Sequence, residues 1–229
     1  LAALKQNVFE AQNFTMAEII AACHADFKGY DQIFEIVFNQ TPKYGNDDDY
    51  ADQLLHTVDV TLQKTIAGRQ TPKGSKTVVE FLPTTCHVYF GEVMEASPNG
   101  RHAGVPLPDG ISPEKGADRL GPTAVIRSCS KLDQLQTGGA LLNQKFTPAV
   151  VAGEAGISNM AHLVRAYFAM DGHHIQFNVV DRKTLLDAQQ HPKDYEDLIV
   201  RVAGYSDYFN NLGRDLQDEI INRTEQSFA

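Results

Sequence analysis

Apolar residues recur every three to four positions through much of the first third of the chain. This spacing is typical of helices that bury one face, and it predicts helices over residues 15–27, 31–39 and 47–67. Thr15 stands where an N-terminal capping residue is expected, and Gly68 follows the third helix, where glycine often ends a helix. The N-terminal third is therefore expected to be mainly helical.

Beyond residue 70 the pattern alternates between short apolar runs and helical periods. Runs of β-branched and apolar residues predict strands, and 3.6-residue periods predict helices. The expected strands are 77–82, 175–180 and 198–203, and the expected helices are 122–132, 158–171, 181–190 and 214–226, with Ser158 and Asp181 as caps. The first of these strands is apolar enough to be buried, and the last is apolar on both faces apart from Arg201, which predicts a strand buried on both sides. Residues 97–121, rich in glycine and proline, predict a long loop.

A glycine, Gly204, directly follows the predicted strand 198–203. A glycine in that position usually serves a turn, a bulge or a close backbone approach. Its surroundings are apolar and aromatic, since Tyr205, Tyr208 and Phe209 come after it. The position alone favours a structural role for this glycine.

Six residues around this glycine, Arg201-Val202-Ala203-Gly204-Tyr205-Ser206, resemble the signature of the glycyl radical enzymes. Further segments resemble the same family, in order and spacing, over about residues 40–229. They are Pro42 to Asp47, Ser97 to Gly104, Asp109 to Pro113, Ser130 to Leu132, Gln176 to Val180, Leu185 to Gln189 and Ile220 to Thr224. The run from Tyr205 to Phe209 looks closer to the dehydratase-like branch, whose members act on hydroxyproline or on diols such as glycerol, than to pyruvate formate-lyase.

The resemblance implies an α/β fold, part of a ten-stranded barrel built of two half-barrels. Residues 1–96 would be the C-terminal part of the barrel, with helices and the strand 77–82. Residues 97–229 would be the glycyl radical domain, with its C-terminal loop and helix. The resemblance also implies that Gly204 carries the radical. Four neighbours would support the radical loop: Arg201, Ala203, Tyr205 and Ser206.

Glycine suits a backbone radical for a physical reason. An unpaired electron on Cα is stabilised by delocalisation into the two flanking amides, which requires a nearly planar Cα. A Cβ would strain that planarity, whereas glycine has none and accepts unusual backbone angles. The radical must also be kept from water and oxidants. The apolar strand and the aromatic residues Tyr205, Tyr208 and Phe209 are therefore expected to shield Gly204.

The resemblance further implies a radical relay. A radical S-adenosylmethionine activase, which has an iron–sulfur cluster, takes a hydrogen atom from Gly204, so the chain itself binds no cofactor. The glycyl radical then takes a hydrogen atom from a cysteine on a second loop. The resulting thiyl attacks a small hydroxylated substrate in a lyase or dehydratase reaction that breaks a C–O bond. The full enzyme would be a cytoplasmic homodimer.

The cysteine half of this relay is missing from the sequence. The family's thiyl cysteine lies upstream in a Gly-Cys-x-Glu-like motif, and no such motif occurs here. Cys23, Cys86 and Cys129 are most simply small, partly buried apolar residues. The chain also starts without methionine. The missing N-terminal part with the cysteine loop is therefore expected to be a required partner.

Thr84 follows the predicted strand 77–82. Strand ends face the active site in barrel enzymes, so Thr84 is a candidate for lining the substrate pocket. An equally good interpretation is a loop hydroxyl that makes a local turn.

The composition argues against several other classes of function. The net charge of −9 argues against nucleic-acid binding, because phosphate contacts need clustered Lys and Arg. No apolar run approaches the roughly 18 residues of a membrane span. An odd number of cysteines fits a reducing cytoplasm. The histidines show no metal-ligand spacing, and Asp47-Asp48-Asp49 at a helix start is better explained by helix-dipole compensation than by a cation site.

Other interpretations stay open. The chain could be a stand-alone spare-part subunit that carries the radical and docks on a partner holding the cysteine loop. It could belong to a pyruvate formate-lyase-like acyltransferase. It could also be a scaffold that keeps the fold without the chemistry, although retention of Gly204 and its neighbours argues against that.

Overall fold

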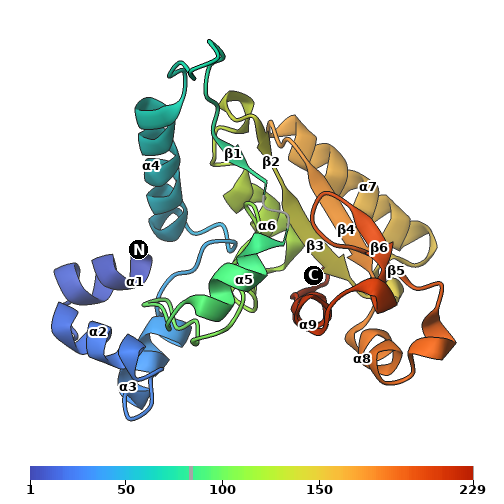
Figure 1. Ribbon diagram of the computed structural model, residues 1–229, viewed down its shortest axis with the longest axis horizontal. Helices are drawn as coiled ribbons and strands as arrows, with labels where there is room; N and C mark the ends of the chain where they lie inside the picture. The colour runs from blue at the N-terminus through green and yellow to red at the C-terminus, as the bar shows by residue number, and fades with distance from the viewer. Residues whose placement is uncertain (83–84, 229) are drawn as a thin grey trace.

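The computed structural model describes residues 1–82 and 85–228 (Figure 1). Three clusters of buried apolar side chains follow one another along the chain. The first lies among the N-terminal helices, the second between a central sheet and its helices, and the third beneath the C-terminal elements. Figure 1 shows the N-terminal helices on one side of the molecule and the C-terminal elements on the other.

The N-terminal third is helical, as its periodicity predicts. Its helices are α1 (Ala2–Leu4), α2 (Met16–His24), α3 (Asp31–Glu35) and α4 (Asp49–Ile66), and π-helical turns at Lys5–Glu10 and Ile36–Gln40 extend α1 and α3. The predicted cap at Thr15 is confirmed. Its hydroxyl accepts a hydrogen bond from the Glu18 amide, and the Glu18 carboxylate accepts one from the Thr15 amide. This reciprocal pair fixes the start of α2.

The strands form three small sheets. Their bounds are β1 (Glu80–Phe81), β2 (Gly139–Ala140), β3 (Leu142–Phe146), β4 (Ile175–Val179), β5 (Ile199–Arg201), β6 (Ser206–Tyr208) and β7 (Glu225–Gln226). In the largest sheet β3 lies between β4 and β7 and is parallel to both. β1 is parallel to β2, and β5 is antiparallel to β6. Parallel neighbours need long crossovers, and helix α7 supplies the one between β3 and β4.

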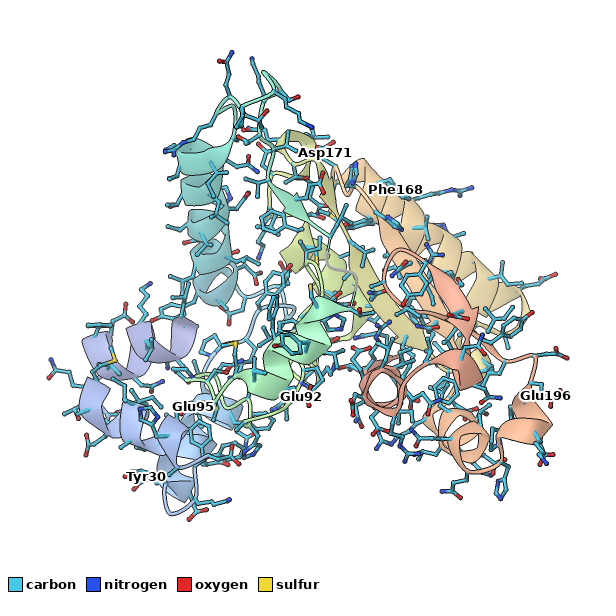
Figure 2. The ribbon with its side chains drawn as sticks, viewed as in Figure 1. Tyr30, Glu92, Glu95, Phe168, Asp171 and Glu196 are labelled. Atoms are coloured by element: carbon cyan, nitrogen blue, oxygen red, sulfur yellow. The ribbon has the colours of Figure 1, made fainter. Side chains whose placement is uncertain are left out.

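Further helices pack around these sheets. They are α5 (Cys86–Val93), α6 (Gly121–Cys129), α7 (Gly153–Ala169), α8 (Arg182–Gln190) and α9 (Arg214–Ile221), with short 3-10 turns at Gln134–Gln136, Pro148–Val151, Pro192–Tyr195 and Phe209–Asn211. Phe168 and Asp171 mark the end of α7 in Figure 2. Asp181 caps α8 as predicted, since its carboxylate accepts a hydrogen bond from the Thr184 amide.

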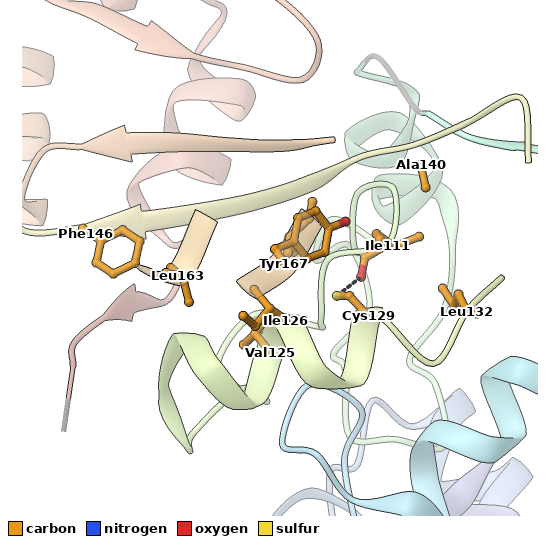
Figure 3. Close-up of a cluster of buried hydrophobic side chains, with 10 residues drawn as sticks. Ile111, Val125, Ile126, Cys129, Leu132, Ala140, Phe146, Leu163 and Tyr167 are labelled. Carbon is orange, nitrogen blue, oxygen red and sulfur yellow. Dashed lines mark hydrogen bonds between the residues drawn. The ribbon is translucent and has the colours of Figure 1, made fainter. Parts of the chain in front are cut away.

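The central cluster joins β3 to helices α6 and α7 (Figure 3). Phe146 on β3, Ile126 on α6 and Tyr167 on α7 are all fully buried in it. Burial of each such side chain contributes roughly 1.5–3 kcal/mol. The Tyr167 hydroxyl is also satisfied, because it donates to Gln134 Oε1 at 2.9 Å. This core supports the strand β4, which in turn supports the site described below.

Several expected boundaries are wrong. The buried strand expected over 77–82 pairs only at Glu80–Phe81, because its partner β2 has just two residues, and Val78 is 58% exposed. Ser158 does not cap a helix. Helix α7 begins at Gly153, directly after a 3-10 turn and without a side-chain cap. The last helix stops at Ile221, because the chain then turns to add β7 to the edge of β3.

The hydrophobic pattern also missed α5, β2 and β3. Strand β3 holds the consecutive polar residues Asn143, Gln144 and Lys145, so it lacks the apolar run that predicts a buried strand. Their side-chain nitrogens donate to oxygen atoms from distant parts of the chain, at Asp109, Pro122 and Ile221. A buried polar strand of this kind depends on tertiary partners, which a local pattern does not contain.

Candidate functional site

Gly204 lies at the tip of the hairpin formed by β5 and β6. The Val202 amide donates to the Tyr205 carbonyl at 2.9 Å and closes the turn. Gly204 has a φ of +78°, in the left-handed region where a Cβ causes strain. A Cβ built at this position would meet nothing within 4 Å. The backbone angle, and not a lack of space, therefore favours glycine here.

The hairpin is covered on one side only. Three of its side chains are buried in the C-terminal cluster: Val200, Val202 and Phe209. Three others are 39% to 58% exposed: Tyr205, Tyr208 and Ile199. Gly204 itself is exposed. The predictions of a strand buried on both sides and of shielding by Tyr205 and Tyr208 are therefore wrong for the described chain, because this alternation places one face on a core and the other outward.

Side chains, rather than a backbone ladder, join the hairpin to the central sheet. Asn178 on β4 uses both ends of its amide on one residue of β5. Its Nδ2 donates to the Arg201 carbonyl at 2.7 Å, and its Oδ1 accepts from the Arg201 amide at 2.7 Å. The asparagine thus supplies the two partners that a neighbouring strand would offer.

Arg223, which follows α9, makes a second set of hydrogen bonds to the end of β5. Its guanidinium is buried and donates to the Val202 carbonyl at 2.9 Å and to the Arg201 carbonyl at 3.2 Å. These carbonyls belong to the two residues before Ala203 and Gly204. The planar fork of an arginine fixes two acceptors in one geometry, so Arg223 sets the backbone path into the turn.

A buried carboxylate orients that arginine. Glu219 on α9 contacts Arg223 Nε and Nη2 at 3.2 and 2.8 Å, and Lys115 Nζ lies 3.1 Å from the same carboxylate. Burial by itself would raise the pKa of Glu219, but the charges of Arg223 and Lys115 outweigh burial and hold the pKa well below its usual range. Burial would likewise lower the pKa of Arg223, and Glu219 with Asp109 raises it instead. The pair is therefore charged.

The residues predicted to support the radical loop come together in the hairpin. Arg201 Nε donates to Gln176 Oε1 at 2.6 Å, and its Nη1 donates to Ser206 Oγ at 3.2 Å across the hairpin. Ala203 is buried, and Tyr205 contributes through its carbonyl. Gln176 Oε1 also accepts the Gly204 amide at 3.3 Å. Arg201 and Gly204 thus share one acceptor.

The sequence reasoning missed Gln176, Asn178 and Arg223 as site residues. A signal existed for the first two, because both lie on the same face of the predicted strand 175–180. Both are buried, at 5% exposure, although polar. Two buried amides on one strand face indicate a specific polar partner. No comparable local signal marks Arg223, whose contacts come from residues about 20 positions earlier.

The cysteines differ from one another. Cys129 is fully buried, accepts a hydrogen bond from the Tyr44 hydroxyl at 3.1 Å, and contacts Ile111 O (Figure 3). Burial raises the pKa of the Cys129 thiol to about 12, so the thiol stays neutral. Cys23 is also buried, whereas Cys86 is exposed at the start of α5. The expectation of partial burial is therefore wrong for Cys86.

The acidic run at the start of α4 has two structural roles. Asp48 caps the helix by accepting from the Tyr50 amide at 2.9 Å. Lys131 Nζ lies 3.0 Å from Asp47 and 2.8 Å from Asp49, so a lysine occupies the place of a cation. In the part of the chain that the structure covers, no three His, Cys, Asp or Glu side chains come together to hold a metal ion. Thr84 lies outside the described residues.

Comparison with known families decides which family the chain belongs to. The model described as "Glycine radical" matches residues 107–210, which include Gly204, and the model described as "Pyruvate formate lyase-like" matches residues 1–91. The chain belongs to the glycyl radical enzyme family. The family predicted from the sequence motifs is therefore confirmed.

Relatives in this family carry the names of dehydratases and lyases. Trans-4-hydroxy-L-proline dehydratase of Clostridioides difficile is 60% identical over 228 residues, which are 100% of this chain and 29% of the relative. Isethionate sulfite-lyase of Bilophila wadsworthia is 42% identical and matches 98% of this chain and 27% of its own length. The chain thus spans about three tenths of the curated glycyl radical enzymes it matches.

Solved glycyl radical enzymes have the same fold. The hydroxyproline dehydratase from Clostridioides difficile, with trans-4-hydroxy-L-proline bound, matches with a TM-score of 0.97 over 99% of this chain and 29% of that one. The B12-independent glycerol dehydratase from Clostridium butyricum, 41% identical, matches with a TM-score of 0.95 over 99% of this chain and 29% of that one. The predicted α/β class is confirmed, and the chain corresponds to the C-terminal part of the glycyl radical enzyme barrel. No helix among the described residues is long and apolar enough to cross a membrane.

Proposed function

We propose that this chain is the radical-storing part of a glycyl radical enzyme and that Gly204 carries the radical. The position of Gly204 is the observation that supports this proposal. It has a left-handed backbone angle at a hairpin tip, lies within the residues matched by the glycine radical model, and donates its amide to Gln176. Glycine alone lets Cα become planar without straining a Cβ.

The proposed chemistry is a series of hydrogen-atom transfers. An activase that uses S-adenosylmethionine and an iron–sulfur cluster provides a radical that takes one hydrogen atom from the Gly204 Cα. The Gly204 radical takes a hydrogen atom from a cysteine thiol, and the thiyl takes one from a substrate carbon. The substrate radical loses its hydroxyl group and one of its own protons as water. The product radical then takes the hydrogen atom back from the cysteine, which regenerates the thiyl.

The neighbours of Gly204 are proposed to hold its loop in shape. Arg201 would do so through its contacts with Gln176 and Ser206, which tie the two hairpin strands to β4. Ala203 is buried, with 2% exposure. Tyr205 closes the turn through its carbonyl. Each contact limits the rotation of the peptide planes on which delocalisation of the unpaired electron depends.

The exposed side of the hairpin supports a requirement for further protein. Gly204 and Tyr205 are exposed here, and the chain spans 29% of the hydroxyproline dehydratase it matches. We propose that the remaining part of the enzyme carries the thiyl cysteine and covers the hairpin. In this proposal residues 1–96 complete the barrel and 97–229 form the radical domain of a homodimeric enzyme in an anaerobic cytoplasm.

The proposed substrate is trans-4-hydroxy-L-proline, with a diol as second choice. The name of the relative at 60% identity supports the first. The glycerol dehydratase from Clostridium butyricum, at 41% identity, supports the second. Thr84 is proposed to line the substrate pocket, since it follows the segment that contains β1.

The test uses the full-length enzyme, activated without oxygen by its activase. Supplied with trans-4-hydroxy-L-proline, glycerol or 1,2-propanediol, it is expected to dehydrate the first fastest, as measured by product formation. Air exposure is expected to cut the activated chain at Gly204, because oxygen adds to a Cα radical, and mass spectrometry locates the cut. An enzyme that turns over but keeps its intact mass in air would contradict a radical on Gly204.

A further inference from the structure

One side-chain oxygen contacts the backbone of Gly204 in the described residues. Gln176 Oε1 accepts the Gly204 amide at 3.3 Å and Arg201 Nε at 2.6 Å. An amide nitrogen and a guanidinium nitrogen are both donors, so the oxygen of Gln176, and not its NH2 group, must face them. Gln176 is buried on β4, in the largest sheet.

A chain of polar groups behind Gln176 fixes this orientation. Gln176 Nε2 donates to Asn143 Oδ1 on the neighbouring strand β3, and Asn143 Nδ2 donates to Asp109 Oδ2. Asp109 Oδ2 also lies 3.7 Å from the buried Arg223 guanidinium, and a carboxylate paired with an arginine accepts hydrogen bonds. Asp109 therefore sets the direction of every bond in the chain and makes the Gln176 oxygen point toward the hairpin.

We propose that Gln176 is a positioning residue that stabilises the radical on Gly204; the inference rests on the proposed function. In the radical, the Gly204 amide nitrogen gives electron density to Cα, so its N–H becomes a stronger donor. The hydrogen bond to Gln176 is then stronger in the radical than in the unactivated chain. An interaction that is stronger in one state shifts the equilibrium toward that state. The same bond holds the amide plane in line with the planar Cα.

The test compares three variants of the full-length enzyme after activation. Gln176→Leu removes the acceptor, and Gln176→Glu keeps an acceptor oxygen. Gln144→Leu is the matched control, because Gln144 is also buried on the central sheet but, among the residues that the structure describes, its side chain bonds only the Pro122 carbonyl, at 3.4 Å. Electron paramagnetic resonance in H2O and D2O measures the coupling to the exchangeable Gly204 amide proton, and spin counting gives radicals per chain.

Gln176→Leu is expected to change the amide-proton coupling and to lower the radical yield about two- to tenfold, the factor by which losing one hydrogen bond changes an equilibrium. Gln176→Glu and Gln144→Leu are expected to keep the wild-type coupling. The inference is overturned if Gln176→Leu keeps the wild-type coupling, if a folded Gln176→Glu loses it, or if Gln144→Leu changes it as much as Gln176→Leu. A wild-type enzyme without any glycine-centred signal would instead overturn the proposed function.

Discussion

The central sheet and the hairpin that carries Gly204 are held in different ways. β3 and β4 share a ladder of five residue pairs, and Leu142 and Phe146 are fully buried in the core beside it. β5 and β6 pair with each other over three residue pairs, and their described hydrogen bonds to β4 and to the segment after α9 run through side chains. A backbone ladder survives most substitutions. The hairpin, in contrast, depends on a few side chains that single substitutions can remove.

Removing Arg223 should have the largest effect on the hairpin. Arg223→Met leaves Glu219 buried without its main partner and removes the donor to the Val202 carbonyl, which costs about 3–5 kcal/mol. Hydrogen exchange of the full-length protein should show this loss of local stability in residues 199–208. Arg214→Met is the control, because Arg214 makes an exposed ion pair with Asp218 at 3.5 Å, which is worth at most about 1 kcal/mol. Equal losses in the two variants would contradict the role given to Arg223.

A core substitution should act on both regions together. Leu142→Ala leaves a cavity beneath β3 and is expected to lower the free energy of unfolding by about 2–5 kcal/mol. The hairpin is hydrogen-bonded to side chains of β4. Protection from hydrogen exchange should therefore fall in residues 142–146, 175–179 and 199–208 alike. A loss confined to β3 would show that the hairpin is supported independently of the sheet.

Removing Asn178 should destabilise the hairpin without affecting the central strand β3. Asn178→Ala leaves the Arg201 amide without its acceptor and leaves the Arg201 carbonyl with Arg223 Nη1 at 3.2 Å, at a cost of about 1–3 kcal/mol for a buried backbone group. The loss of protection should appear in residues 199–208 and spare β3. The control is Asn211→Ala, an exposed asparagine near the same hairpin that donates to Asp207 at 3.1 Å, and it should change little. Equal loss in β3 would contradict this division.

Two buried carboxyls near the C-terminal segment should respond to pH with opposite signs. Glu219 has a lowered pKa, so its stabilisation is present above the unfolded value of about 4.3 and is lost as the pH falls through its folded pKa. Burial raises the pKa of Asp118, which accepts from Thr224 at 2.6 Å, to about 6. Its contribution is full below about pH 4 and is lost as the pH rises through about 6.

Asp118→Asn should therefore remove the pH dependence of folding stability that Asp118 contributes. The stability difference between wild type and Asp118→Asn should change by on the order of 2 kcal/mol between pH 4 and pH 7, with the wild type losing more as the pH rises. Urea unfolding at several pH values measures the difference. A difference that is constant with pH would show that Asp118 does not titrate in this range.

The sequence predicted the elements whose causes are local. The cap at Thr15, the amphipathic helix α4 and the cap of α8 at Asp181 all lie within a few residues of the structure they determine. The motif around Gly204 predicted the family. Strand β3 was missed, because Lys145 and its neighbours are buried only through partners at positions such as Ile221.

The surroundings of Gly204 could be predicted only in part. The motif contains Arg201 and Ser206, which do meet across the hairpin. Its supports Gln176 and Arg223 lie 28 and about 20 positions away in the chain. Both fall in segments that resemble the family, but nothing in those segments shows that their side chains contact the hairpin. The expected shield was wrong because apolar sequence next to Gly204 does not decide which face of a hairpin is covered.

The central claim is that the unpaired electron sits on the Cα of Gly204. Electron paramagnetic resonance of the activated full-length enzyme, made with ordinary glycine and with glycine deuterated at Cα, tests this directly. A doublet that collapses on deuteration is expected, and Gly204→Ala should abolish it. Gly29→Ala should not, although Gly29 has a similar φ of +81° and equally open space for a Cβ. A doublet that survives Gly204→Ala, or does not collapse on deuteration, would contradict the account.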